Sequence, residues 1–436
     1  MSTPIAAQAI TPAMTQGQAQ AAASAFDLRA LPADFLANPY PVYAALRETE
    51  PIKRLPDGSI FLTRYGDLAA VYRDAVNFSS DKQVEFAPKY GAGSPLFEHH
   101  TTSLVFNDPP LHTRVRQLIM GALTRRAIAD MEPGLMTLVD SLLDRIEAQG
   151  GGDLIEDFAS AIPVEIIGNL LGVPADDREP LRHWSLAILG ALEPVITPNQ
   201  QALGERSVTE MLAYLKGLVG ERRKQPGDAE RDVLTRLIQG ERNGEGSGEQ
   251  LSEVELLHNC IFLLNAGHET TTNLIGNGLI VLQEFPAARQ SLLSDMHAAD
   301  SDGAALETVL TLAVDEFLRF EPSNQLGNRR VVKATQVGGV DLPVGTLVTL
   351  CIGAANRDPA QFDQPETLNL RRSPNKHLAF GLGIHQCAGL SLARLEGRIA
   401  IGRFLQRFPG FRLTAPPTRG GRARFRGFLR APFALA

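Results

Sequence analysis

Apolar residues recur at helical spacing through the middle of the chain, from His112 to about Phe320. This period predicts amphipathic helices, among them segments 131–149, 210–223 and 251–285. The third segment differs because its centre, residues 260–264, is apolar on every side, so we expect it to be buried all round. At ~1.5 Å of rise per residue, a helix of this length extends about 50 Å and crosses a whole domain.

Short extended segments flank this helical region. Turn residues at 56–58 predict a hairpin over 51–64, and the patterns at 337–348 and 425–432 predict further small strands. Helices are also expected at 42–49 and 391–407. The stretch from Asp81 to Pro110 shows little periodicity, which indicates a long loop of the kind that often covers a site. The whole pattern predicts a mainly α fold with small β-sheets near both ends, of the α+β class.

The composition narrows the function. The 436 residues carry 42 Lys and Arg against 49 Asp and Glu, a net charge of −7 that disfavours binding of nucleic acid through overall charge. Three widely spaced cysteines without a CxxC pair indicate a reducing, cytoplasmic environment. No apolar run is long enough for a membrane anchor. Residues 1–25, rich in Ala, Gln, Thr and Ser, are expected to form a disordered tail, and residues 26–436 a single domain.

The most informative segment is FGLGIHQCAG, residues 380–389, in which glycines frame one cysteine just before a helix. Glycine lets the backbone approach a flat ligand closely, and a helix N-terminus favours a thiolate. One cysteine alone cannot hold zinc or an iron–sulfur cluster, but it can be the single protein ligand of a haem iron. A phosphate-binding loop, a nucleophile pair of Cys387 with His385, and a plain buried cysteine are the alternatives.

This segment resembles the haem-binding signature of the cytochrome P-450 family, Phe-Gly-x-Gly-x-x-x-Cys-x-Gly, at every specified position. The resemblance extends from about residue 26 to the C-terminus. It implies a triangular-prism helical domain with a minor β-rich lobe, and haem b between the long central helix and the cysteine-bearing loop. By the same resemblance Cys387 binds the iron, Phe380 packs near its sulfur, and Gly389 belongs to the cofactor site.

The long helix carries AGHETT, residues 266–271, near its centre. An acid and an alcohol are costly to bury unless they are satisfied, and taken alone they are also compatible with a kink whose polar groups cap one another. The segment resembles the acid–alcohol pair of the family. This resemblance implies that Thr270 hydrogen-bonds dioxygen, that Glu269 helps to relay protons, and that Ala266 lies against the haem, while His268 faces a neighbouring helix.

Further charged residues match the family. Glu316 and Arg319, at i and i+3 on one helix face, resemble its Glu-x-x-Arg motif, and Arg372 matches the second arginine of that buried network. The residues that match its partners for the two haem propionates are His112, Arg116, Arg329 and His385. The substrate contacts implied by the resemblance, besides Ala266 and the loop from Asp81 to Asn107, are Leu264, Gln325, Leu326 and Phe428.

The expected function is that of a monomeric monooxygenase that uses dioxygen and two electrons to hydroxylate or epoxidise a hydrophobic small molecule. No flavin or nicotinamide motif is found, so we expect a ferredoxin or flavodoxin with its NAD(P)H-dependent reductase as partner. The residues that are candidates for a basic docking patch are Arg114, Lys376, Arg394 and Arg398. The alternatives are a peroxide-driven peroxygenase, a non-catalytic haem sensor or scaffold, and a cysteine hydrolase.

Overall fold

The computed structural model describes residues 14–229, 232–242 and 251–435. The α-helices are α1 (Gln16–Ala25), α2 (Ala33–Ala37), α3 (Tyr40–Thr49), α4 (Tyr65–Arg73), α5 (Gln83–Tyr90), α6 (Pro95–Thr102), α7 (Leu111–Ala122), α8 (Arg125–Gln149), α9 (Ala161–Leu170), α10 (Glu179–Gly190), α11 (Pro198–Lys224), α12 (Val233–Arg242), α13 (Glu253–Glu284), α14 (Pro286–Ala299), α15 (Gly303–Phe320), α16 (Ile352–Ala355) and α17 (Leu390–Arg407). Short 3-10 turns lie at η1 (Leu104–Phe106), η3 (Ala175–Asp177) and η4 (Gly383–His385), and a π-helical turn lies at η2 (Leu154–Ala159).

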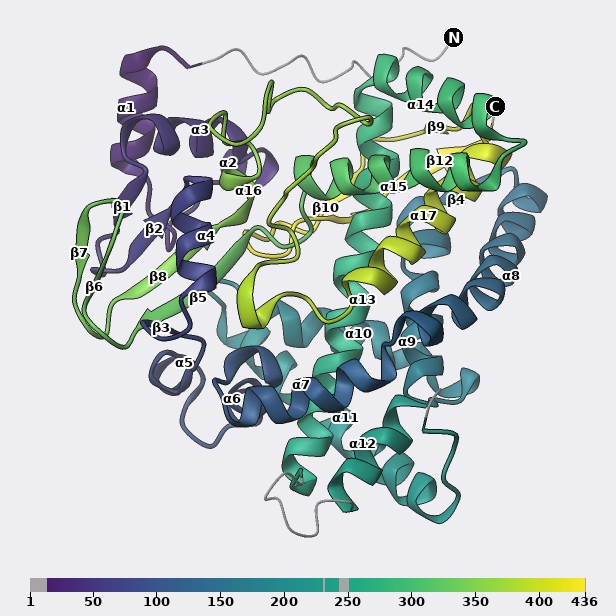
Figure 1. The fold of residues 1–436 in the computed structure, drawn as a ribbon, viewed down its shortest axis with the longest axis horizontal. Coiled ribbons are helices and arrows are strands. Elements are labelled where there is room, and N and C mark those ends of the chain that lie inside the picture. The colour runs from purple at the N-terminus through teal and green to yellow at the C-terminus, as the bar shows by residue number, and fades with distance from the viewer. Residues whose placement is uncertain (1–13, 230–231, 243–250, 436) are drawn as a thin grey trace.

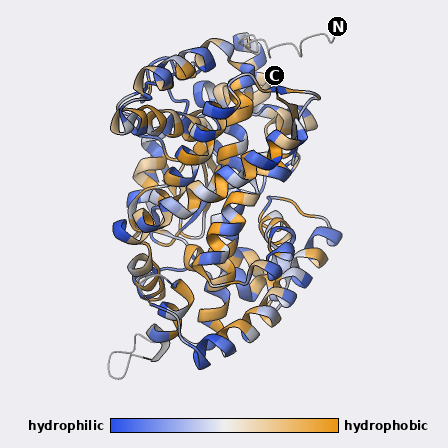
Figure 2. Cartoon of the chain, turned by 90° about the vertical axis from the view of Figure 1, so that its right-hand side faces the viewer, coloured by the Kyte–Doolittle hydropathy of each residue, from blue (hydrophilic) through white to orange (hydrophobic). Residues whose placement is uncertain are grey.

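The long helix α13 runs through the middle of the molecule, with other helices packed around it (Figure 1). It begins with a capping box, in which Ser252 and Glu255 satisfy each other's backbone N–H groups. Helices α9, α10, α11, α15 and α17 contact it, and its apolar residues are mostly buried. The prediction of one long buried helix over 251–285 is therefore confirmed. In Figure 2, polar residues lie mainly on the outward faces of the surrounding helices.

The main sheet lies beside the helical part, next to helices α1 to α4 (Figure 1). The strands are β1 (Ile52–Arg54), β2 (Ile60–Leu62), β3 (Phe78–Ser79), β4 (Gly151–Asp153), β5 (Leu326–Val331), β6 (Thr335–Val337), β7 (Val340–Leu342), β8 (Leu347–Cys351), β9 (Arg412–Leu413), β10 (Thr418–Arg419), β11 (Phe428–Arg430) and β12 (Pro432–Ala434). The main sheet has the order β1-β2-β8-β5-β3, and β1 and β2 form the predicted hairpin. The remaining strands form small sheets, so the mainly α class with minor sheets is confirmed.

Two sequence predictions were wrong. The expected loop from Asp81 to Pro110 contains α5, α6 and η1, because Ser94 caps α6 and apolar residues such as Phe86 and Leu96 face the core. Within the expected tail 1–25, residues 16–25 form α1, whose Ala19 and Ala23 are buried. Small side chains pack closely without making the segment hydrophobic, and the sequence pattern missed them for this reason. Residues 1–13 lie outside the described part of the chain.

In the described part of the chain, none of the helices combines the length and the apolar character needed to cross a bilayer.

Candidate active site

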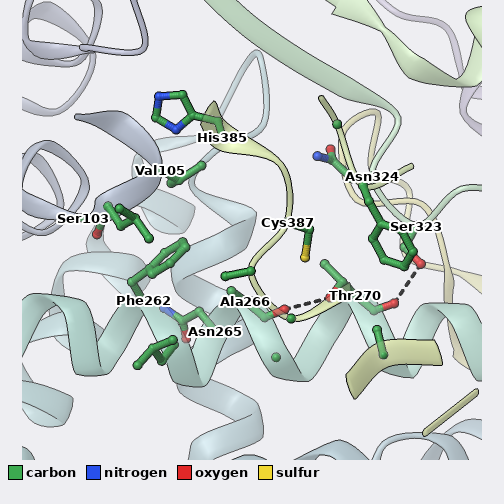
Figure 3. A pocket seen from close by; sticks show the side chains of 18 of the residues that line it. Ser103, Val105, Phe262, Asn265, Ala266, Thr270, Ser323, Asn324, His385 and Cys387 are labelled. Atoms are coloured by element: carbon green, nitrogen blue, oxygen red, sulfur yellow. Dashed lines mark hydrogen bonds between the residues drawn. The ribbon is translucent and has the colours of Figure 1, made fainter. Parts of the chain in front are cut away.

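A cavity of about 350 Å³ lies between α13 and the segment that precedes α17 (Figure 3). Its walls are mainly apolar, with leucines and isoleucines from α7, α9, α10 and α13. Cys387 lines the cavity from one side, and Ala266 and Thr270 of α13 line it from the other. Figure 3 shows the sulfur of Cys387 directed toward α13 between these two residues. The structure therefore brings together the cysteine loop and the AGHETT segment, which are more than a hundred residues apart.

The shape of the cysteine loop depends on glycine. Gly381 and Gly383 have φ values of 62° and 71°, which side chains rarely adopt. A Cβ on Gly383 would also lie 2.3 Å from the carbonyl oxygen of Tyr72, so no larger residue fits there. The backbone N–H of Cys387 donates a 2.9 Å hydrogen bond to the carbonyl of Phe380, which closes the loop. Gly389 is the N-cap of α17 and also lines the cavity.

The electrostatics at Cys387 differ from what the helix N-terminus alone predicts. Burial raises the pKa of the Cys387 thiol, although the N–H of Gly389 and the charges of Arg116 and Arg394 act in the opposite direction. Desolvation therefore outweighs the helix and the two cations. A thiolate at this position requires a further positive partner on the cavity side, and a bound metal ion is a partner of that kind.

A buried ionic network holds the chain that leads into the cysteine loop. Glu316 and Arg319 are fully buried and joined by two hydrogen bonds of 2.7 and 2.8 Å, and Arg372 donates to the same carboxylate at 3.1 Å. Arg319 also donates to the carbonyls of Asn356 and Pro365. The predicted contacts among the three charged residues are therefore present, and they tie α15 to the segment before the cysteine loop.

The four residues expected to bind propionates all line the same cavity: His112, Arg116, Arg329 and His385. The rings of the two histidines lie 4.1 Å apart. Among the described residues, both ring nitrogens of His112 and Nε2 of His385 lack a hydrogen-bond partner although they are buried. Arg329 donates to the carbonyl of Asn328 and stacks over the ring of Tyr72. Burial lowers the pKa of both guanidinium groups, so an anionic group beside them would be stabilised. The residues present fit a haem with its propionates at this edge.

Glu269 and Thr270 are neighbours in sequence but face different spaces. Thr270 lines the large cavity, and its hydroxyl donates to the carbonyl of Ala266 at 2.7 Å. Glu269 lines a separate pocket of about 20 Å³, large enough for one water molecule. There its carboxylate pairs with Arg422 at 2.6 Å. Burial raises the pKa of Glu269 to about 7 against the attraction of Arg422. His268 lines the small pocket as well, in agreement with the expectation that it faces away from the cofactor.

The predicted substrate contacts are only partly supported. Leu326 lines the large cavity, but Leu264, Gln325 and Phe428 do not. Gln325 is fully buried and donates to the carbonyl of Pro322, because neighbouring residues at the start of a strand point to opposite sides. Leu264 packs within the core, and Phe428 lines the small pocket. The segment from Asp81 to Asn107 does contribute cavity-lining residues, among them His99 and His100. The cavity-lining residues that the sequence analysis missed include Phe262, Leu263, Asn265 and Phe425.

The predicted basic patch is largely neutralised within the chain. Arg114 pairs with Glu255, Arg394 with Asp315, and Arg398 with both Glu132 and Glu307. Lys376 is exposed. Since ion pairing removes most of the field that such a patch would project, these residues give little support to a strongly cationic docking surface.

The site combines a cysteine thiol that lines an apolar cavity, arginines and histidines at the cavity edge, and a helix that carries an acid and an alcohol. These residues fit the site of a haem-thiolate protein. Comparison with known proteins agrees with this class. The chain matches the sequence profile of the family described as Cytochrome P-450 over residues 55–420. It therefore belongs to the cytochrome P-450 family. Its hydroxylase and epoxidase relatives are monooxygenases, which are oxidoreductases.

Similar proteins include bacterial members of this family. A vitamin D(3) 25-hydroxylase from Pseudonocardia autotrophica is 37% identical over 373 residues, which cover 85% of this chain and 86% of the relative. An epothilone C/D epoxidase from Sorangium cellulosum is 34% identical and covers 95% of this chain and 96% of its own. The crystal structure of P450BioI with an acyl carrier protein ligated to hexadec-9Z-enoic acid matches with a TM-score of 0.83 and 32% identity, over 93% of this chain and 100% of that one. The expected fold is thereby confirmed.

Proposed function

We propose that this protein is a haem b-dependent monooxygenase with Cys387 as the iron ligand, and that it hydroxylates or epoxidises a hydrophobic small molecule. The observation that carries the proposal is the sulfur of Cys387 directed across the cavity toward Ala266 and Thr270 (Figure 3). Haem in this position supplies the activation of dioxygen with two electrons. The protein's own residues bind the cofactor, exclude water from the apolar cavity and deliver protons.

Residues at two positions would hold the cofactor: the cysteine loop and the edge of the cavity. Cys387 would bind the iron from a loop whose preceding segment is tied to α15 by the Glu316 network. Arg116 and Arg329 would supply positive charge to the haem propionates at the edge of the cavity. Burial lowers the pKa of His112, and that of His385 to about 2, so these two rings act as neutral hydrogen-bond donors.

Proton delivery is assigned to Thr270 and Glu269. The hydroxyl of Thr270 lies at the cavity wall, where it can pass a proton to an oxygen atom bound in the cavity. Glu269 has a pKa of about 7, so at neutral pH it both takes up and releases a proton readily. Arg422, which is partly exposed, connects this carboxylate to the outside.

The substrate is proposed to be hydrophobic because most of the cavity wall is apolar. The names of similar proteins support a hydrophobic substrate, since they refer to vitamin D(3), to an epothilone and to a long-chain acyl group. Electrons are proposed to come from a ferredoxin or flavodoxin with an NAD(P)H-dependent reductase.

The test is the carbon monoxide difference spectrum of the reduced protein. Wild type should show the spectrum of a thiolate-bound haem, and Cys387→Ser should lose it. Cys351→Ser is the matched control, because Cys351 is another free cysteine but lies in β8 away from the cavity. An unchanged spectrum in Cys387→Ser would refute the ligand assignment. Product formation with peroxide alone, and none with an electron-transfer system, would favour a peroxygenase instead.

A further inference from the structure

Asn265 on α13 is a buried amide without a partner in the described residues. Its side chain is only 2% exposed, yet neither its Oδ1 nor its Nδ2 accepts or donates a hydrogen bond there. Leaving a buried amide unsatisfied costs free energy, and such groups are uncommon. An amide at this position is therefore explained poorly by the packing of the protein itself.

Asn259 on the same helix differs from Asn265 in its hydrogen bonding. Asn259 lies on the same helix and is equally buried, but its amide accepts from the N–H of Leu104 and donates to the carbonyls of Thr102 and Glu255. Asn259 thus joins α13 to the chain after α6. Asn265 has no comparable contact in the described chain, although both are the same residue type in the same helix.

The amide of Asn265 faces the place where a substrate would lie. Asn265 lines the large cavity together with Phe262 and Ala266, and Figure 3 shows it on the part of α13 that faces the cavity. It precedes Thr270 by five residues, about one and a half helical turns, or ~7.5 Å along the axis. A group bound to Asn265 would therefore lie in the same cavity as Thr270, about one and a half turns away along α13.

Helix α6, on another wall of the cavity, also has buried polar atoms without hydrogen-bond partners in the described residues. His99 and His100 of α6 line the cavity and are each 2% exposed, and Nδ1 of His99 and Nε2 of His100 have no partner in the described residues. Burial lowers the pKa of both rings, that of His100 to about 3, so both are neutral donors and acceptors. The ring of His99 also lies 5.6 Å from that of His258 on α13, two turns before Asn265. Polar groups without protein partners thus occur on two helices that face one chamber.

We propose that Asn265 determines substrate specificity by hydrogen-bonding a neutral oxygen substituent of the substrate. The substrate class is then an oxygenated hydrophobic molecule, such as an alcohol, ketone or ester, and not a plain hydrocarbon. Asn265 can donate a hydrogen bond to a carbonyl oxygen or accept one from a hydroxyl group, because its amide has both a donor and an acceptor. This inference rests on the proposed haem-dependent function.

The test uses probes whose binding does not require knowledge of the substrate. Imidazoles bind haem iron, so 4-phenylimidazole and its three monohydroxy isomers each place a ring in the cavity above the iron. Their dissociation constants are measured by the shift of the haem absorption in wild type and in Asn265→Leu. At least one hydroxylated isomer should bind wild type roughly five- to tenfold tighter than the parent compound, as one buried neutral hydrogen bond provides. Asn265→Leu should lose this preference for the hydroxylated isomer.

Thermal unfolding of the haem-loaded proteins separates recognition from a structural role. Asn265→Leu should unfold at the wild-type temperature or above it, whereas Asn259→Leu, the matched control, should unfold several degrees lower because it loses real hydrogen bonds. Equal hydroxyl preferences in wild type and Asn265→Leu would overturn the proposal, and so would destabilisation of Asn265→Leu as large as that of Asn259→Leu. If no imidazole changes the haem spectrum of wild type, the proposed haem function itself fails.

Discussion

Replacing Glu316 by glutamine removes one negative charge from the network that holds the cysteine loop while nearly preserving its shape. The carboxylate accepts two hydrogen bonds at Oε1, from Arg319 and the N–H of Asn369, and three at Oε2, from Arg319, Arg372 and Asn375. In glutamine one of these oxygens becomes an NH2 group. At least two donors then face another donor, and two buried guanidinium groups lose their counter-charge.

The magnitude follows from these contacts. Hydrogen bonds to charged groups contribute about 1.5–3 kcal/mol each, so the loss of two corresponds to roughly 3–6 kcal/mol. Breaking a buried ion pair by removing one partner typically costs about 3–5 kcal/mol. Both estimates are a large part of the ~5–15 kcal/mol that stabilises a folded domain. Glu316→Gln should therefore lower the urea midpoint by roughly 1 M and reduce the fraction of purified protein that contains haem.

The matched control is Asp295→Asn, which breaks another two-bond contact of a carboxylate with an arginine. Asp295 accepts from Nε and Nη2 of Arg371 at 2.7 and 2.6 Å, but the Arg371 side chain is 65% exposed. Exposed ion pairs contribute little, so this variant should keep its haem and its midpoint. Haem content is read from the ratio of haem to protein absorbance, and stability from far-ultraviolet circular dichroism in urea. Equal haem content and equal midpoints in the two variants would refute the reasoning.

Three further outcomes are expected. Thr270→Ala should retain haem but release most of the reducing equivalents as peroxide, measured as product and peroxide formed per NAD(P)H consumed; an undiminished product yield would contradict the role of Thr270. Burial raises the pKa of Glu396 from 4.5 to about 8, so between these values the folded protein holds a proton that the unfolded chain has lost. The stability of wild type relative to Glu396→Gln should thus fall as pH rises through this window. A difference in urea midpoint between the two proteins that does not vary with pH would exclude a raised pKa of Glu396 in the folded state. Arg116→Gln should weaken haem retention against apomyoglobin as a haem acceptor, whereas Arg371→Gln, at an exposed site, should not.

The parts of the site that could be predicted from the sequence are those encoded by short spacings. The cysteine loop needs Gly381 and Gly383 at fixed distances before Cys387, and the geometry of that loop follows from the glycines. Glu316 and Arg319 share a helix face because they are three residues apart. In both cases the local pattern fixes the local geometry, and the structure reproduces it.

The direction of single side chains within a buried segment could not be predicted in this way. The region around Leu264 is apolar on all sides, so no polar position indicates which face meets the cavity, and the structure turns Leu263 toward it instead. Gln325 and Leu326 are adjacent, and only the second lines the cavity. Phe425 lines the cavity where Phe428 was expected. These choices depend on how distant elements pack, which periodicity along one segment does not contain.

Helix α13 separates two spaces that the proposed chemistry has to connect. Successive residues of a helix are rotated by ~100°, so Thr270 lies in the large cavity while Glu269 lies in the small pocket with Arg422. Arg422 donates to Oε1 of Glu269, whereas Oε2 has no partner among the described residues, so Oε2 is the atom available to carry a proton.

The role of Arg422 follows from this arrangement. Its positive charge lowers the pKa of Glu269 against the effect of burial, so Arg422→Gln should raise that pKa and keep the carboxyl group protonated to higher pH. The pH at which coupled turnover changes should then move upward in Arg422→Gln, and no such change should occur in Glu269→Gln. A pH profile of Arg422→Gln identical to that of wild type would show that Glu269 delivers no protons to the cavity, and Thr270 would then have to receive them through the cavity itself.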